Sequence, residues 1–200
     1  MAEVLGEPGA GKSTSCQRAT WELAREGLAG LGSALTVVLP VYFELGAFYH
    51  IDTPRLRDLA PQQRMLRLLA EQMRATLGGK RFDWSQLWKA MESSRFVFFL
   101  DALNEVREGL RERLLEDLSE FMGAFTGCGH EFVITTRKFD YEHEFAPYFA
   151  TKQVALLELL ALDGAGVSEL VMRDLGQIGQ AYAVLAQSDE QERAKAGLSY

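Results

Sequence analysis

Near its N-terminus the sequence reads Gly6-Glu7-Pro8-Gly9-Ala10-Gly11-Lys12-Ser13-Thr14, which fits the pattern G-x-x-x-x-G-K-[S/T]. An apolar run from Ala2 to Leu5 precedes this stretch and predicts a strand. An amphipathic pattern that begins at about Lys12 and stops near Gly27 predicts a helix after it. Glycines let the backbone curl so that successive N–H groups point at phosphate oxygens. The strand–loop–helix context therefore predicts a phosphate-binding loop.

The residue types in this loop have separate roles. Lys12 supplies a mobile cation for the β- and γ-phosphates of a nucleotide, and the Ser13 hydroxyl is a ligand for Mg²⁺. The helix that begins at Lys12 presents the positive end of its dipole to the same phosphates. We therefore predict that residues 6–14 bind ATP or ADP with Mg²⁺, and that Lys12 also takes part in catalysis.

Further apolar runs predict the remaining strands of a sheet. Their expected ranges are Leu35 to Phe43, Phe96 to Leu100, Phe132 to Thr136 and, more weakly, Gln153 to Leu157. Pro40 assigns its strand to an edge, because proline cannot donate a hydrogen bond to the ladder. Helical patterns separate the runs, as in a parallel sheet covered by helices.

This alternation predicts an α/β fold. Together with the phosphate loop, it resembles the three-layer sandwich of P-loop NTPases of the ASCE or AAA+-like type. The sheet is expected to have five mostly parallel strands in the order 5-1-4-3-2. Residues 1–160 are predicted to form the P-loop NTPase core. Residues 161–200 are predicted to be a helical extension, the start of a truncated helical or winged-helix region.

Two acidic residues and one arginine follow the predicted strands where a ligand would bind. Asp101 directly follows a buried strand and can hold Mg²⁺ opposite Ser13. Glu105 lies four residues later and can polarise the attacking water as a general base. Arg137 closes the strand expected between those of the loop and of Asp101, so it can stabilise phosphate charge. Two solvated acids and an exposed arginine are the alternative interpretation.

Together these motifs resemble the NACHT group of the STAND signalling NTPases. The resemblance rests on the phosphate loop, on the Walker B-like Phe98-Phe99-Leu100-Asp101-Ala102-Leu103-Asn104-Glu105-Val106, on the strand Leu39-Pro40-Val41-Tyr42-Phe43-Glu44-Leu45 and on Ile134-Thr135-Thr136-Arg137. It covers roughly residues 1 to 160. Asn104 departs from the pattern, because many members carry a second acidic residue there.

The resemblance implies a slowly hydrolysing, adenine-specific switch that oligomerises when activated. Family members place an effector domain before this core and a winged-helix domain and sensor after it, and bacterial members often act in antiphage defence. Neither type of added domain is recognisable in this chain. Only five residues precede the phosphate loop, so we expect a core taken from a longer chain.

Composition narrows the classes of function. The net charge of −7 argues against a surface dedicated to nucleic acid. No apolar stretch approaches the length of a membrane helix, and a secretory signal is not recognisable. Cys16 and Cys128 give neither a disulfide framework nor metal-ligand spacing, so a reduced, cytoplasmic setting is the simplest expectation.

Other functions remain open on sequence grounds. A kinase or general ATPase with continuous turnover would share the phosphate loop, although no arginine-rich lid is evident. A binding module that never hydrolyses its nucleotide is a third possibility. A GTPase is disfavoured because the Asn-Lys-x-Asp segment that reads guanine does not occur. His50, His130 and His143 are too scattered to predict a metal site, and the segment around His143 is expected to be a loop.

Overall fold

Parallel strands form the centre of the protein. The structure is a computed structural model that describes residues 1–30, 37–48, 56, 58–76, 83–125, 127–150 and 154–160. Its strands are β1 (Ala2–Gly6), β2 (Val38–Glu44), β3 (Arg95–Asp101), β4 (Glu131–Thr136) and β5 (Ala155–Leu159). They pair in the order β2-β3-β4-β1-β5, and every pair is parallel. This order is the predicted 5-1-4-3-2 read from the other edge.

The strand at one edge contains the proline. Pro40 lies in β2, which among the described strands pairs only with β3, as predicted for a strand whose proline cannot donate to the ladder. The bounds of two strands differ from the predicted ones. The second begins at Val38 and ends at Glu44, while residues 35–36 lie outside the described residues. The fifth covers Ala155–Leu159 rather than residues 153–157. Apolar runs locate a strand, but pairing with a neighbour sets its ends.

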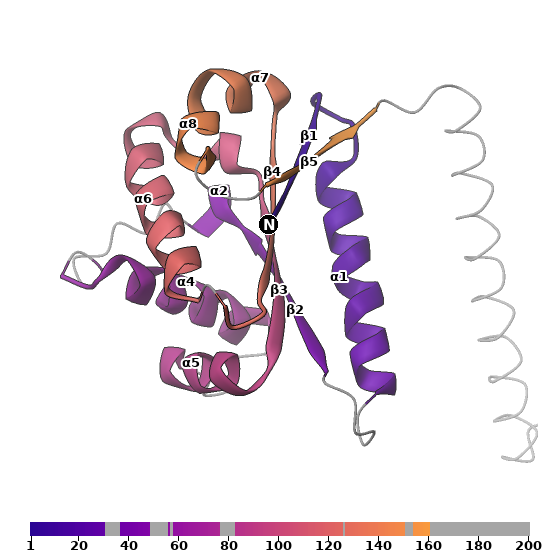
Figure 1. Ribbon diagram of the computed structural model, residues 1–200, viewed down its shortest axis with the longest axis vertical. Helices are drawn as coiled ribbons and strands as arrows, with labels where there is room; N and C mark the ends of the chain where they lie inside the picture. Colours follow the sequence, from indigo (N-terminus) through magenta and orange to yellow (C-terminus); the bar gives the residue numbers. More distant parts are fainter. Residues whose placement is uncertain are drawn as a thin grey trace, which may run out of the picture. The chain divides into compact units, whose positions relative to one another are not determined.

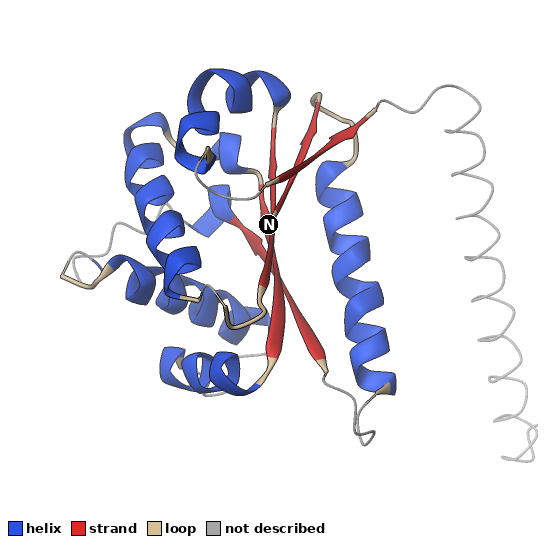
Figure 2. Cartoon of the chain, viewed as in Figure 1, coloured by secondary structure: helices blue, strands red, loops and turns tan. Residues whose placement is uncertain are grey.

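Helices cover both faces of this sheet (Figures 1 and 2). Among the described helices only α1 (Lys12–Ala29) lies on one face, where Cys16 packs against Val97 and Phe99. The other face carries α4 (Pro61–Thr76), α5 (Trp84–Ser93) and α6 (Glu108–Ala124). The shorter elements are α2 (Leu45–Phe48), the 3-10 turn η1 (Leu103–Glu105), α7 (Lys138–Asp140), the π-helical η2 (Tyr141–Phe145) and α8 (Ala146–Phe149).

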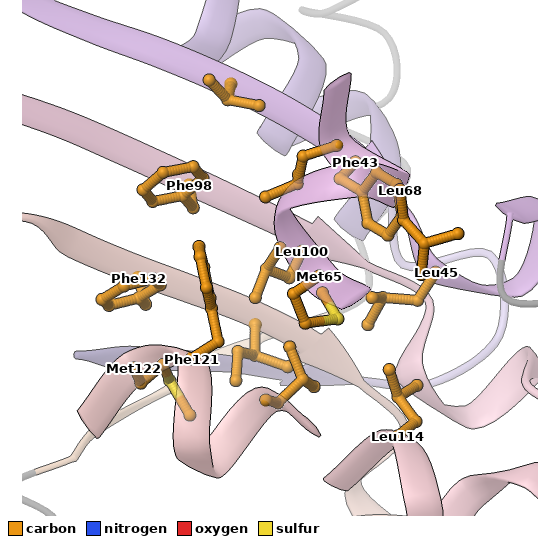
Figure 3. Close-up of a cluster of buried hydrophobic side chains, with 14 of the residues drawn as sticks. Phe43, Leu45, Met65, Leu68, Phe98, Leu100, Leu114, Phe121, Met122 and Phe132 are labelled. Carbon is orange, nitrogen blue, oxygen red and sulfur yellow. The ribbon is translucent and has the colours of Figure 1, made fainter. Parts of the chain in front are cut away.

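The larger core lies between the sheet and the helices α4, α5 and α6 (Figure 3). Phe98 in β3 contacts several aromatic rings of this core. Its ring stacks on that of Phe132, with centroids 5.2 Å apart, and meets the ring of Phe121 edge-on at 5.6 Å. The predicted α6 stripe of Leu114, Leu118 and Phe121 is fully buried here. Burial on both faces of β3 explains why its sequence is apolar without alternation.

Local signals set several helix ends. Asp83 caps α5, because its carboxylate accepts from the N–H groups of Ser85 and Gln86, and the Gln86 side chain accepts from the Asp83 N–H. The prediction of a loop around His143 is wrong. Its residues form η2, where the imidazole stacks on Phe139 with ring centroids 4.1 Å apart.

The chain divides into two compact units, of which Met1–Leu160 contains every described residue. The predicted helical extension of residues 161–200 lies outside the described part, as does His50. Within the described part, no helix is long and apolar enough to cross a membrane.

Candidate functional site

The sheet order brings three chain segments together at one edge. Strands β3, β4 and β1 are consecutive neighbours, so their carboxyl ends lie side by side. Asp101 ends β3, Arg137 follows β4, and the glycine loop follows β1. A pocket of about 340 Å³ opens there, lined by Pro8, Gly9, Gly11, Lys12, Ser13, Thr14, Asp101, Ala102, Asn104, Glu105, Thr135 and Arg137. Gly6, Glu7 and Ala10 belong to the loop but do not line the pocket.

The glycines of the loop are required by its backbone. Gly9 and Gly11 have φ angles of +81° and +86°, in the left-handed region that disfavours side chains. A Cβ on Gly6 would lie 3.0 Å from the carbonyl oxygen of Leu159 in the neighbouring β5. The loop therefore curls tightly before α1 begins at Lys12, with the first N–H groups of that helix at the pocket.

The Lys12 ammonium group folds back over the loop. It donates to the carbonyl oxygens of Gly6 at 2.7 Å and of Glu7 at 3.0 Å. Burial lowers the pKa of Lys12, the charge of Arg137 lowers it further, and nearby carboxylates partly oppose both effects. An anion between Lys12 and Arg137 would reduce this repulsion.

Asp101 is buried, and both oxygens of its carboxylate accept hydrogen bonds. The Thr135 hydroxyl donates to Oδ1, and the Tyr42 hydroxyl donates to Oδ2 at 2.6 Å. Burial and the bond to Asp101 raise the pKa of Tyr42, which keeps the phenol protonated as a donor. Thr135 in turn accepts from the N–H of Ala102, a non-glycine residue with a positive φ of 61°. The carboxylate is thus fixed in orientation before any ligand arrives.

The other two charged side chains of the pocket are exposed. Within the described part of the chain, neither the Glu105 carboxylate nor the Arg137 guanidinium makes a hydrogen bond or ion pair. Glu105 ends the η1 turn and Arg137 precedes α7, so both are carried on short connections at the rim. Both side chains are free to contact a ligand.

The donor set suits a small, hard cation bound together with phosphate. The Ser13 hydroxyl and the Asp101 carboxylate offer oxygen ligands, which Mg²⁺ prefers. Among the described residues no group of three or more His, Cys, Asp or Glu side chains could hold a metal by itself. Phosphate oxygens and water would complete the coordination, which is how Mg²⁺ is usually held at nucleotide sites.

The pocket brings together four of the charged residues predicted for the site, Lys12, Asp101, Glu105 and Arg137, whereas Glu7 does not line it. Sequence reasoning assigned no role to Tyr42 or Thr135. A signal for Thr135 existed, because its strand was already expected beside that of Asp101. The contact of Tyr42 depends on the rotamers of two side chains from neighbouring strands, and periodicity does not give these.

Comparison with known proteins supports the fold. No family model matches the chain, and no curated protein matches it. Among solved structures it is similar to the Aeropyrum pernix ORC1 protein in complex with DNA, with a TM-score of 0.54 and 14% sequence identity. The match covers 88% of this chain and 43% of that one, so the chain spans less than half the length of this neighbour. With the parallel five-stranded sheet, the likeness indicates a P-loop ATPase-like fold.

Proposed function

We propose that this chain binds ATP with Mg²⁺ in the pocket at the end of β1, β3 and β4, and hydrolyses it slowly. The observation that carries the proposal is the convergence of the glycine loop and Lys12 with Asp101 and Glu105 in one cavity. The P-loop ATPase-like fold supports it, because this fold suggests nucleotide binding at the same edge of the sheet.

Each residue of the pocket has its own role in the transfer of the γ-phosphoryl group to water. The loop N–H groups and Lys12 hold the β- and γ-phosphates, and Ser13 and Asp101 hold Mg²⁺, which neutralises phosphate charge when bound. Glu105 accepts a proton from the attacking water. Arg137 stabilises charge on the γ-phosphate oxygens. Slow turnover fits a site in which the Glu105 and Arg137 side chains are exposed and make no hydrogen bond or ion pair within the described residues.

The finer proposal is a NACHT-type STAND switch, carried by the resemblance of the four motifs. In such a switch, ADP marks the resting state and ATP the signalling state. A homo-oligomer, effector and sensor domains and a role in antiphage defence belong to this proposal. The absence of direct nucleic-acid binding stays a prediction from the acidic composition. The ORC1 structure contains DNA, which bears on that protein only.

The first experiment identifies the nucleotide that the protein carries. We expect ADP to be released when natively purified protein is denatured, and the isolated protein to bind ATP in the presence of Mg²⁺. In Lys12→Ala we expect roughly ten- to hundredfold weaker binding, because a charged hydrogen-bond donor to phosphate is lost. Lys89→Ala on α5, outside the pocket lining, is the matched control. Bound GDP would reject the adenine-specific switch, and no binding by the wild type would reject the proposal.

The bond between Tyr42 and Asp101 gives a second prediction. In Tyr42→Phe the Asp101 carboxylate loses one of its two orienting donors. We expect the Mg²⁺ concentration needed for half-maximal ATP binding to rise about tenfold, since partners of metal ligands typically contribute this much. ATP binding without Mg²⁺ should be unchanged. Tyr148→Phe on α8 is the control, and equal Mg²⁺ dependence in both variants would contradict the prediction.

A further inference from the structure

Arg111, in the first turns of α6, joins three parts of the chain. Its Nε donates to the carbonyl oxygen of Val106 at 2.8 Å, and its Nη2 donates to that of Asn104 at 2.8 Å. Its Nη1 donates to Oε2 of Glu144 in η2 at 2.7 Å. The guanidinium carbon also lies 5.9 Å from the centre of the Phe145 ring. Arg111 is therefore held on several sides.

The two carbonyl groups bound by Arg111 belong to Asn104 and Val106, the residues on either side of Glu105. They end a short 3-10 turn, where carbonyls have few backbone partners. A planar guanidinium can bind two acceptors at fixed angles, which a lysine ammonium cannot do. The bond to the Asn104 carbonyl thus restrains the peptide unit that joins Asn104 to Glu105, and the bond to the Val106 carbonyl restrains the chain just after Glu105. The Glu105 side chain itself stays exposed in the pocket.

A second contact restrains Glu105 independently. Gly46 in α2 lies so close that a Cβ built on it would be 3.1 Å from the Cβ of Glu105. The Glu105 backbone carbonyl carbon would be 3.6 Å away. The position of Glu105 is thus set by close packing against α2 as well as by hydrogen bonds from α6.

We propose that Arg111 is a positioning residue that holds Glu105 in the geometry needed to activate water, and that its bond to Glu144 links this geometry to the segment after Arg137. The inference rests on the proposed function, in which Glu105 is the general base. Arg111 does not line the pocket and so acts only through the residues it holds. A shift at either end of this link would move the base relative to the γ-phosphate.

The test compares Arg111→Met with the wild type in ATP binding and in single-turnover hydrolysis. We expect roughly tenfold slower hydrolysis, because small displacements of a catalytic group cost one to two orders of magnitude in rate. ATP affinity should stay within about twofold, since no pocket-lining group is removed. Arg113→Met on the same helix, which makes no hydrogen bond or ion pair with the described residues, should behave as wild type.

The effect must disappear when Glu105 is already absent. In a Glu105→Gln background, Arg111→Met should slow hydrolysis no further, because a residue that acts through Glu105 has nothing left to position. An equal drop in both backgrounds would overturn the inference. If Arg111→Met does not fold, Arg111→Lys keeps the charge and the stem without the planar fork. Full activity of this lysine variant would also overturn the inference.

The possible failures are distinguishable. A wild type that binds ATP but never hydrolyses it would reject Glu105 as a base, and with it both the proposed hydrolysis and the role of Arg111. A wild type that hydrolyses ATP, together with a fully active Arg111→Met, would leave the proposed function standing and remove only the role of Arg111.

Discussion

Replacing Glu105 with glutamine is expected to slow ATP hydrolysis by about three orders of magnitude while leaving ATP binding intact, which is the usual size of a general-base contribution. The reason is the chemistry of the side chain. Glutamine keeps the shape of glutamate but cannot accept the proton of the attacking water. Glu105 lines the pocket, is exposed, and forms no hydrogen bond or ion pair through its side chain within the described residues. Its loss therefore breaks no internal contact of the fold.

Binding and hydrolysis must be measured separately for this variant. ATP affinity should be equal to that of the wild type or somewhat higher, because one negative charge near the phosphates is removed. Single-turnover hydrolysis with saturating protein isolates the chemical step. Glu112→Gln, an exposed change on α6, controls for the loss of charge alone. Unchanged hydrolysis in Glu105→Gln would show that another group activates water.

Hydrolysis by the wild type that disappears in Glu105→Gln would exclude the non-hydrolysing binding module. The rate of the wild type separates the two remaining functions. Turnover of many molecules per second by the isolated chain would favour a general ATPase, since median enzymes turn over about ten times per second. A rate orders of magnitude lower would favour the switch, because its ATP-bound state must persist long enough to signal before hydrolysis ends it.

The candidate site was predictable at positions where the backbone conformation or the chemistry admits only one or a few residue types. The glycine loop carries its own signature, since Gly9 and Gly11 have φ angles that other residues avoid. The edge position of β2 and the interior position of β3 were predictable as well, from Pro40 and from the apolar run of β3. These features depend on local chemistry, which the sequence states directly. The full strand order was expected from the P-loop type of fold.

The supporting contacts were not predictable, for a physical reason. Tyr42 meets Asp101 across 59 positions of sequence, and Arg111 meets Glu144 across 33. Each contact depends on rotamers and on helix placement, and neither leaves a periodic signal. The sequence does not distinguish Arg111 from the other charged residues of its amphipathic helix. Its role is visible only from the structure, where two of its three bonds go to the residues on either side of Glu105.

Glu3 in β1 is a second residue that the sequence does not single out. Its side chain is fully buried in the strand that leads into the phosphate loop, between Ile134 and Leu156 of the neighbouring strands. Neither carboxylate oxygen has a hydrogen-bond partner among the described residues, and burial raises the pKa of Glu3 from 4.5 to about 8. Tyr141 has its own pKa raised by burial and by the charge of Glu3. A protonated Glu3 at neutral pH is the consequence.

Glu3 should therefore make the folded state less stable as the pH rises. The unfolded chain releases the Glu3 proton near pH 4.5, whereas the folded chain keeps it until about pH 8. Between these values the folded state binds more protons, so its contribution is full below pH 4.5 and is lost as the pH approaches 8. We expect Glu3→Gln to remove this loss. Between pH 5 and pH 8 the free energy of unfolding should therefore fall by roughly 2 to 3 kcal/mol less in the variant than in the wild type.

The measurement is denaturant unfolding of both proteins at pH 5 and pH 8. Only the difference between wild type and variant is used, so other titrating groups cancel. Glu120→Gln, an exposed change on α6, should follow the wild type at both values. Parallel stability profiles in the wild type and Glu3→Gln would mean that Glu3 is ionised in the folded state, with water or a group beyond the described residues as its partner. If Glu3→Gln instead removes the loss of stability, deprotonation of Glu3 at high pH would weaken β1 and, with it, the loop that leads from this strand to Lys12.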